Sequence, residues 1–318
     1  MAKAFVFPGQ GSQAVGMGLE LKQSFAAARE VFEEVDDALG QNLSKLMAEG
    51  PIETLTLTEN AQPALMAVSL AVLRVLQTEG GLALPARVAF VAGHSLGEYS
   101  ALAAAGTFTV AEAARLLRLR GQAMQSAVPV GVGAMAAMLG LELAVAEEVA
   151  KEAALAPDGS RQVCEPANDN APGKVVLSGH KAAVERAIEI AKGKGGRRSI
   201  LLPVSAPFHC ALMQPAADAM AEALAKATLR PPAVPLVANV TAQPSAEPSV
   251  IRRQLVEQVT GRVRWRESVL AMKAAEVDTL IELGAGKVLS GLARRIDPEV
   301  NGIACGTPAE VEAVLKLL

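Results

Sequence analysis

A short apolar strand that ends in a glycine-flanked turn, followed by a helix of small residues, constrains this chain most. Val88–Ala92 is fully apolar, which is typical of a parallel strand buried on both faces. The run ends at Gly93, and small residues with helical character follow over Leu96–Ala105. Ala4–Phe7 reads as another buried strand, and Ala64–Leu76 has the apolar spacing of a helix. This alternation predicts an α/β fold with a hydrolase-like parallel sheet.

The pattern changes near residue 130, where Pro129–Gly133 has the composition of a hinge. The segment that follows predicts strand, helix, strand, strand, helix and strand, which is the ferredoxin-like βαββαβ order. The strands are expected at 134–139, 162–167, 174–178 and 198–202, and the helices at 144–154 and 182–192. We therefore expect a small domain over 128–203, inserted into a large catalytic domain made of 1–127 and 204–318.

Composition excludes several classes of protein. The chain has 318 residues, of which 51% are hydrophobic, and a net charge of −3, which suits a large globular core and disfavours nucleic acid as a partner. Its three cysteines are far apart and form no CxxC pair, so neither a metal site nor a disulfide framework is predicted. No signal peptide or membrane-spanning run of about 20 apolar residues is evident. We expect a cytoplasmic protein that does not bind membranes.

Gly93-His94-Ser95-Leu96-Gly97 matches G-x-S-x-G, and it lies between a strand and a helix as that motif requires. A sharp turn there would push the Ser95 hydroxyl into the open, at a helix N-terminus that favours a developing negative charge. Ser95 is therefore predicted to be a nucleophile. The alternative is that Ser95 only caps the helix.

A serine nucleophile needs a base, and the chain has three histidines from which to choose. His94 adjoins Ser95, and its side chain should diverge from that of the serine. His180 opens a predicted helix. His209 lies where the chain re-enters the large domain, so it is the best candidate, with a structural core histidine as the alternative. No Asp or Glu stands out as a third member, and a backbone carbonyl could orient the ring instead.

Arg120 falls on the apolar face of the helix predicted over Ala111–Met124. A charge on a buried face needs a partner, and a guanidinium group can bind a carboxylate with two hydrogen bonds. That carboxylate could belong to this protein or to a substrate, and spacing alone leaves both possibilities open.

The loop Gly9–Ala14 follows the first strand and loosely resembles a dinucleotide-binding turn. No acidic residue stands at the end of a second strand to support that interpretation. The alternative is that this loop supplies a backbone N–H to an oxyanion hole beside Ser95.

Together these segments resemble the malonyl-CoA:acyl carrier protein transacylases of bacterial fatty acid synthesis, over essentially the whole chain. The segments that carry the resemblance are 5–13, 93–99, 118–121, 167–173, 205–209 and 282–289. The resemblance implies a hydrolase-like α/β domain with an inserted ferredoxin-like domain. It also implies that Ser95 is the nucleophile, that His209 is the general base, that the amides of Gln10 and Leu96 form the oxyanion hole, and that Arg120 binds the malonyl carboxylate.

The resemblance extends to residues around these groups. It implies that the main-chain carbonyl of Gln258 orients His209 and that Asn168 shapes the cleft between the domains. Phe208 would crowd an α-methyl group and so disfavour methylmalonyl, and Met124 is expected in the same acyl pocket.

The implied donor is malonyl-CoA and the implied acceptor is the phosphopantetheine thiol of an acyl carrier protein. We expect no cofactor, no metal and a monomer. Because acyl carrier proteins are acidic, Lys174, Lys194, Arg197 and Arg198 are candidates for a docking surface, or they are ordinary solvated charges. Three rival interpretations remain: a serine thioesterase or esterase, a non-catalytic carrier-docking domain, and a stand-alone acyltransferase of a polyketide pathway.

Overall fold

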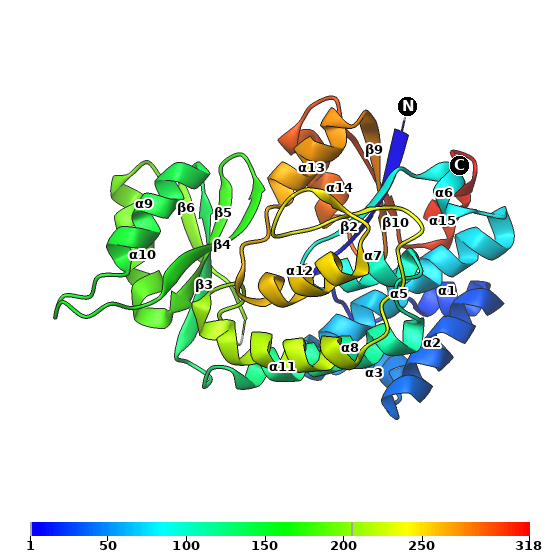
Figure 1. The fold of residues 1–318 in the computed structure, drawn as a ribbon, viewed down its shortest axis with the longest axis horizontal. Helices are drawn as coiled ribbons and strands as arrows, with labels where there is room; N and C mark the ends of the chain where they lie inside the picture. Colours follow the sequence, from blue (N-terminus) through cyan, green and yellow to red (C-terminus); the bar gives the residue numbers. More distant parts are fainter. Residues whose placement is uncertain (1, 205) are drawn as a thin grey trace.

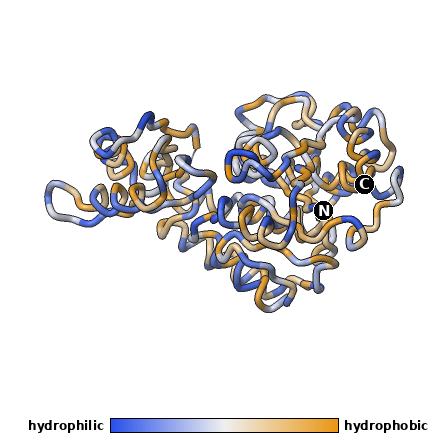
Figure 2. The backbone as a smooth tube through the Cα atoms, turned by 90° about the horizontal axis from the view of Figure 1, so that it is seen from above, coloured by the Kyte–Doolittle hydropathy of each residue, from blue (hydrophilic) through white to orange (hydrophobic). Residues whose placement is uncertain are grey.

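The computed structural model describes residues 2–204 and 206–318. Ser205, which opens the segment that contains His209, lies outside the described residues. The chain forms two bodies that lie side by side, each built on its own sheet (Figure 1). Both termini lie in the larger body (Figure 2).

The larger body is built on a six-stranded sheet with the order β10-β9-β1-β2-β7-β8. Its strands are β1 (Ala2–Phe7), β2 (Phe90–Gly93), β7 (Leu236–Val237), β8 (Pro244–Ser245), β9 (Val277–Leu283) and β10 (Asn301–Cys305). All neighbouring strands pair in parallel except β8, which is antiparallel to β7. The predicted mostly parallel sheet is thus present.

Helices cover both faces of this sheet (Figure 1). They are α1 (Leu19–Ser24), α2 (Ala26–Leu39), α3 (Leu43–Glu49), α4 (Ile52–Thr56), α5 (Thr58–Gly80), α6 (Leu84–Arg87), α7 (Gly97–Ala104), α8 (Val110–Ser126), α11 (Gln214–Lys226), α12 (Pro248–Thr260), α13 (Trp265–Ala274), α14 (Val288–Ile296) and α15 (Pro308–Leu315), with a 3₁₀ turn at Ala211–Met213.

The alternation of side chains along β1 explains the two layers. Phe5 and Phe7 join the core that contains α5, α7 and α8, whereas Ala4 and Val6 join the core beneath α13 and α14. All four side chains are fully buried, as expected for a central parallel strand. The carboxyl ends of β1 and β2 therefore lie inside the molecule, next to the loops that follow them.

The helix α5 is long and apolar enough, by length and composition alone, to cross a membrane. Most of it is buried inside this body, so its apolar character is accounted for by the core.

The smaller body is built on an antiparallel sheet with the order β4-β5-β3-β6. Its elements follow one another as β3 (Gly133–Leu139), α9 (Leu143–Ala153), β4 (Cys164–Ala171), β5 (Lys174–His180), α10 (Lys181–Gly193) and β6 (Arg198–Leu201). This is the order of strands and helices predicted for the segment. The helices α9 and α10 share a separate apolar core with one face of the sheet, and the other face is turned toward the larger body.

Candidate active site

The turn between β2 and α7 holds Ser95 in a strained backbone conformation. Ser95 has φ 54°, in the left-handed region that non-glycine residues rarely occupy. The flanking glycines make the turn possible. A Cβ on Gly93 would lie 1.9 Å from the carbonyl carbon of Gly97, and a Cβ on Gly97 would lie 2.2 Å from the carbonyl oxygen of Phe7. The chain is therefore packed too closely for any side chain at these two positions.

His209 lies against the Ser95 hydroxyl, although 114 residues separate them in the chain. The distance from Ser95 Oγ to His209 Nε2 is 2.8 Å. On the other side of the ring, Nδ1 faces the main-chain carbonyl oxygens of Gln258 at 2.8 Å and Gly261 at 3.1 Å. Carbonyl oxygens only accept, so Nδ1 carries the hydrogen and Nε2 is free to accept the serine proton.

Burial is the main cause that lowers the pKa of His209 to about 3, and the positive charge of Arg120 lowers it further. The imidazole is therefore neutral in the free protein near neutral pH. Its orientation comes from two carbonyl oxygens, with no carboxylate at Nδ1 within the described residues.

Arg120 approaches the same hydroxyl from α8. Its side chain is fully buried, and Nη2 donates to Ser95 Oγ at 3.1 Å. Two amide oxygens hold the guanidinium group: Gln62 Oε1 at 2.9 Å from Nη1 and Gln258 Oε1 at 2.8 Å from Nη2. Within residues 2–204 and 206–318, all of its hydrogen-bond partners are uncharged, and Nε has none. The sequence left open whether a carboxylate of this protein pairs with Arg120, and no such direct contact is present in the described part of the chain.

Two backbone N–H groups near Ser95 have no hydrogen-bond partner within the part of the chain that the structure describes. They belong to Gln10, in the loop after β1, and to Leu96, at the start of α7. Free N–H groups beside a nucleophile can form an oxyanion hole.

Ser95 and His209 open into a pocket of about 480 Å³ between the two bodies. Gln10, Asn168 and Phe208 line the same pocket, so five of the predicted site residues line it, while Arg120 and Gln258 contact Ser95 and His209 without lining it. Met124 is placed elsewhere. It is buried behind Gln62, whose Nε2 lies 3.6 Å from its sulfur, and it does not line this pocket.

The other two histidines have structural partners. His94 Nε2 lies 2.8 Å from Asn170 Oδ1, and its ring packs at 5.9 Å from that of Trp265. His180 Nδ1 accepts from the Val163 N–H at 2.9 Å. Neither ring contacts the Ser95 hydroxyl, in agreement with the choice of His209 from the sequence.

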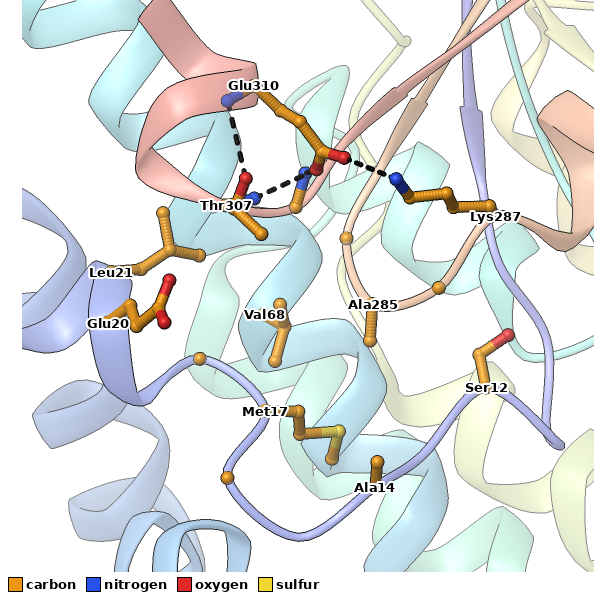
Figure 3. A pocket seen from close by; sticks show the side chains of 15 residues that line it. Ser12, Ala14, Met17, Glu20, Leu21, Val68, Ala285, Lys287, Thr307 and Glu310 are labelled. Carbon is orange, nitrogen blue, oxygen red and sulfur yellow. Dashed lines mark hydrogen bonds and ion pairs between the residues drawn. The ribbon is translucent and has the colours of Figure 1, made fainter.

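A second pocket, of about 410 Å³, lies beyond the loop that follows β1 (Figure 3). Ser12, Ala14 and Met17 line one side, and the Lys287–Glu310 ion pair of 2.9 Å lies on the other. None of the predicted site residues lines it. No cluster of three or more metal-ligating side chains occurs within the described residues.

Sequence reasoning missed three residues that hold the site. Gln62 binds the guanidinium group, as described above. Asn239 Oδ1 accepts the Ser95 N–H at 2.8 Å, and its Nδ2 donates to the Gly93 carbonyl at 2.6 Å. Glu98 is fully buried beneath the turn. For Glu98 the sequence signal was a carboxylate within a helix of small apolar residues. Asn239 and Gln62 had no comparable signal in the sequence.

The fold and the site together are those of an acyltransferase. The model of the acyl transferase domain family matches residues 4–295. The chain is 48% identical over 314 residues to the malonyl CoA-acyl carrier protein transacylase of Escherichia coli K12, with 99% of each chain covered. It therefore belongs to the acyl transferase family and, within it, to the malonyl CoA-acyl carrier protein transacylases.

Solved structures agree with this membership. The acyl-carrier-protein S-malonyltransferase of Bartonella henselae is similar with a TM-score of 0.96 and 56% identity, covering 100% of this chain and 99% of that one. A malonyl-transacylase solved in complex with its type II polyketide synthase acyl-carrier protein is similar with a TM-score of 0.95 and 42% identity, with 100% of both chains covered.

Proposed function

We propose that this protein transfers the malonyl group of malonyl-CoA to the phosphopantetheine thiol of an acyl carrier protein, through a malonyl-serine intermediate, and so supplies malonyl-carrier for fatty acid biosynthesis. One observation carries the proposal: Ser95 Oγ lies 2.8 Å from His209 Nε2 and 3.1 Å from Arg120 Nη2. A nucleophile, a base and a carboxylate-binding cation thus meet at one atom.

In the first half of the cycle, His209 Nε2 accepts the Ser95 proton while Oγ attacks the thioester carbonyl. The negative charge that develops on the carbonyl oxygen is received by the N–H groups of Gln10 and Leu96, and the loss of one such donor typically lowers the rate by about 10²–10³-fold. The C–S bond then breaks, and coenzyme A leaves with the proton from His209. A malonyl ester on Ser95 remains.

In the second half, the carrier thiol gives its proton to His209 and attacks the ester carbonyl. The C–O bond to Ser95 breaks, His209 returns the proton to Oγ, and the malonyl-carrier leaves. Because His209 is neutral at the start of each half, it serves as base and then as acid without any change in its resting state.

Arg120 selects the acyl group by binding the free malonyl carboxylate. Only uncharged groups contact its guanidinium group within the described residues, so an arriving carboxylate can replace Ser95 as the partner of Nη2. Acetyl offers no such group and should be a poor substrate. Phe208 lines the pocket beside Ser95 and should exclude an α-methyl branch.

We assign the smaller body, over 128–203, to a ferredoxin-like domain inserted into a catalytic domain of 1–127 and 204–318. The order of its elements and the antiparallel strand order β4-β5-β3-β6 support this assignment. Its role would be to form the second wall of the acyl pocket, through Met135 and Asn168. We also propose that the protein acts as a cytoplasmic monomer.

Mass spectrometry of the protein after incubation with malonyl-CoA tests the proposed function. We expect a stable malonyl adduct on Ser95 that is discharged by an acyl carrier protein, and no adduct on Ser95→Ala. Release of free malonate without any added thiol would instead indicate a thioesterase. A malonyl adduct that a polyketide carrier discharges faster than a fatty acid carrier would move the protein to a polyketide pathway.

A further inference from the structure

Glu98 is a buried carboxylate that the proposed reaction does not use. It is the second residue of α7, it lies beneath the Ser95 turn, and its side chain is fully buried. Its two oxygens have separate partners: Oε1 accepts from the Asn239 N–H at 3.2 Å, and Oε2 accepts from Gln258 Nε2. A buried carboxylate is unfavourable unless it is paired, so its presence at this point requires a reason.

The contacts of Gln258 fix its side-chain amide in one orientation. Its Nε2 donates to Glu98 and to the Ser95 main-chain carbonyl, the latter at 2.9 Å. A carbonyl and an ionised carboxylate are acceptors only, so the NH₂ group must face them. The amide oxygen is therefore turned toward Arg120, and it accepts from Nη2 at 2.8 Å.

Gln258 consequently separates two opposite buried charges by one neutral amide. A carboxylate in direct contact with Arg120 would form a strong, often bidentate pair and would compete with the carboxylate of a substrate. Through the amide, Glu98 compensates the charge of Arg120 and leaves the guanidinium fork without an acidic partner. Burial raises the pKa of Glu98 to about 7, opposed by the hydrogen bonds from Gln258 and Asn239 and by the charge of Arg120, so its negative charge prevails above that pH.

We propose that Glu98 is a positioning residue that acts through the Gln258 amide to hold Arg120 ready for a carboxylate-bearing acyl group. This inference rests on the proposed function, because the guanidinium group must first bind the malonyl carboxylate. Glu98 touches neither the substrate nor the reacting atoms. Glu98 affects which acyl group is selected, and it affects the proton transfer between Ser95 and His209 only indirectly.

The test is the ratio of kcat/KM for malonyl-CoA to that for acetyl-CoA in Glu98→Gln. In this variant an NH₂ group must face either the Asn239 N–H or Gln258 Nε2, so one of the two hydrogen bonds that Glu98 accepts is lost and the support of the Gln258 amide is weakened. We expect the ratio to fall roughly tenfold or more, as for a lost hydrogen bond to a charged group, mainly through a higher KM for malonyl-CoA. Glu79→Gln, at an exposed position of α5, is the control for the change in net charge.

A double-mutant cycle separates positioning from a general structural effect. If Glu98 acts through Arg120, Glu98→Gln should leave the acyl-CoA ratio unchanged in an Arg120→Ala background. A purely structural role would lower the rates for both thioesters alike and leave the ratio of the single variant intact. An unchanged or increased ratio in Glu98→Gln overturns the inference, as does a further loss in the Arg120→Ala background.

If Glu98→Gln does not fold, Glu98→Asp keeps the charge and withdraws the carboxylate from Gln258 by one methylene. The ratio should then fall as well, and an unchanged ratio overturns the inference. Measurement of the wild-type protein tells a failure of the proposed function from a failure of the inference. A wild type that does not prefer malonyl-CoA refutes the proposed function, whereas a malonyl-to-acetyl ratio that stays at the wild-type value in the Glu98 variants refutes the inference alone.

Discussion

At the scale of single residues, the Ser95 hydroxyl is arranged by two neighbours with opposite demands. It donates to His209 Nε2 and accepts from Arg120 Nη2. The same arginine charge that lowers the pKa of His209 is also available to an incoming carboxylate. Burial is the larger cause of the low pKa of His209 and the Arg120 charge the second, so a carboxylate bound to Arg120 should offset only the second cause.

The first prediction follows from that charge. Because burial and then Arg120 lower the pKa of His209 to about 3, His209 stays neutral in the wild type well below pH 6. Arg120→Met should raise this pKa, so the acid limb of kcat/KM for acetyl-CoA should move to higher pH. Acetyl-CoA is the suitable substrate because it does not need the guanidinium group.

The pH profile of kcat/KM reports groups of the free enzyme, so it measures this shift directly. Burial raises the pKa of Glu98 and the charge of Arg120 lowers it. Loss of the arginine should therefore raise the pKa of Glu98 as well as that of His209. The shift should therefore persist when Arg120→Met is combined with Glu98→Gln. A midpoint that stays in place, or that moves to lower pH, would contradict the assignment of the limb to His209.

The second prediction concerns Asn239, whose side chain bonds to both the Ser95 N–H and the Gly93 carbonyl of the turn. Asn239→Ala leaves the Ser95 N–H and the Gly93 carbonyl without the partners that they have at 2.8 and 2.6 Å. An unsatisfied buried polar group costs about 1–3 kcal/mol, so the free energy of unfolding in urea should fall by at least about that amount. Asn301→Ala, at an exposed position, is the control and should change it by less than about 0.5 kcal/mol.

The sequence predicted the groups whose chemistry is visible in a motif, and the structure brings their side chains into contact. Ser95 follows from G-x-S-x-G, His209 from elimination among the histidines, and Arg120 from its place on an apolar helix face. The role of the Gln258 carbonyl could not come from a residue pattern, since every residue has a carbonyl. Gln62 and Asn239 act through hydrogen bonds that only the folded chain brings together.

At the scale of the elements, the close approach of β1 to the start of α7 decides whether the turn can form. The third prediction compares two glycines that are both within helices. A Cβ on Gly97 would lie 2.2 Å from the Phe7 carbonyl oxygen, whereas a Cβ on Gly291 in α14 would meet nothing within 4 Å. Gly97→Ala should lower the free energy of unfolding by about 3 kcal/mol or more, or prevent folding.

Gly291→Ala should instead raise the free energy of unfolding by about 0.5–1 kcal/mol, because alanine loses less backbone entropy than glycine when the helix forms. Chemical denaturation of the two variants measures both effects. Similar stabilities for Gly97→Ala and the wild type would show that the strand and the helix can move apart, and would remove the steric reason given for the motif.

The elements that were well predicted are those with a clear period. The segment 133–201 shows alternating strands and amphipathic helices, and its order was predicted correctly. The strand expected at Val88–Ala92 is observed as Phe90–Gly93, and Val88 is instead the C-cap of the short helix α6 (Leu84–Arg87). The short helices before α5 and the two-residue strands β7 and β8 have too few residues for a period, so only tertiary pairing defines them.

At the scale of the whole molecule, the pocket depends on how the two sheets are joined. The strand β4 bonds to the segment before α13, through Asp169 N–H to the Val263 carbonyl at 3.0 Å and Val263 N–H to the Ala167 carbonyl at 2.8 Å. Arg266 pairs with the buried Asp169 at 2.9 Å. These contacts join the smaller body to the larger one next to Asn168, which lines the pocket.

The last prediction concerns the carrier, which must reach Ser95 past the smaller body. Lys174 and Arg198 both pair with Leu139 in the antiparallel sheet, so their side chains lie on the face that Leu139 shares with the pocket residue Met135. Lys194 differs, because it lies on the helical side and already pairs with Glu148 at 3.6 Å. Lys174 and Arg198 therefore lie on the pocket face of the sheet, and Lys194 lies on the helical side.

Charge reversal distinguishes the two groups. Lys174→Glu and Arg198→Glu should lower kcat/KM for transfer to an acidic carrier by roughly tenfold at low ionic strength, since charged rims act mainly on association. The defect should shrink with added salt, which screens exposed charges, and transfer to a small thiol should be unaffected. Lys194→Glu is the matched control and should behave as the wild type. If it alone impairs carrier transfer, the carrier docks on the helical side of the smaller body and the assignment of the pocket face is wrong.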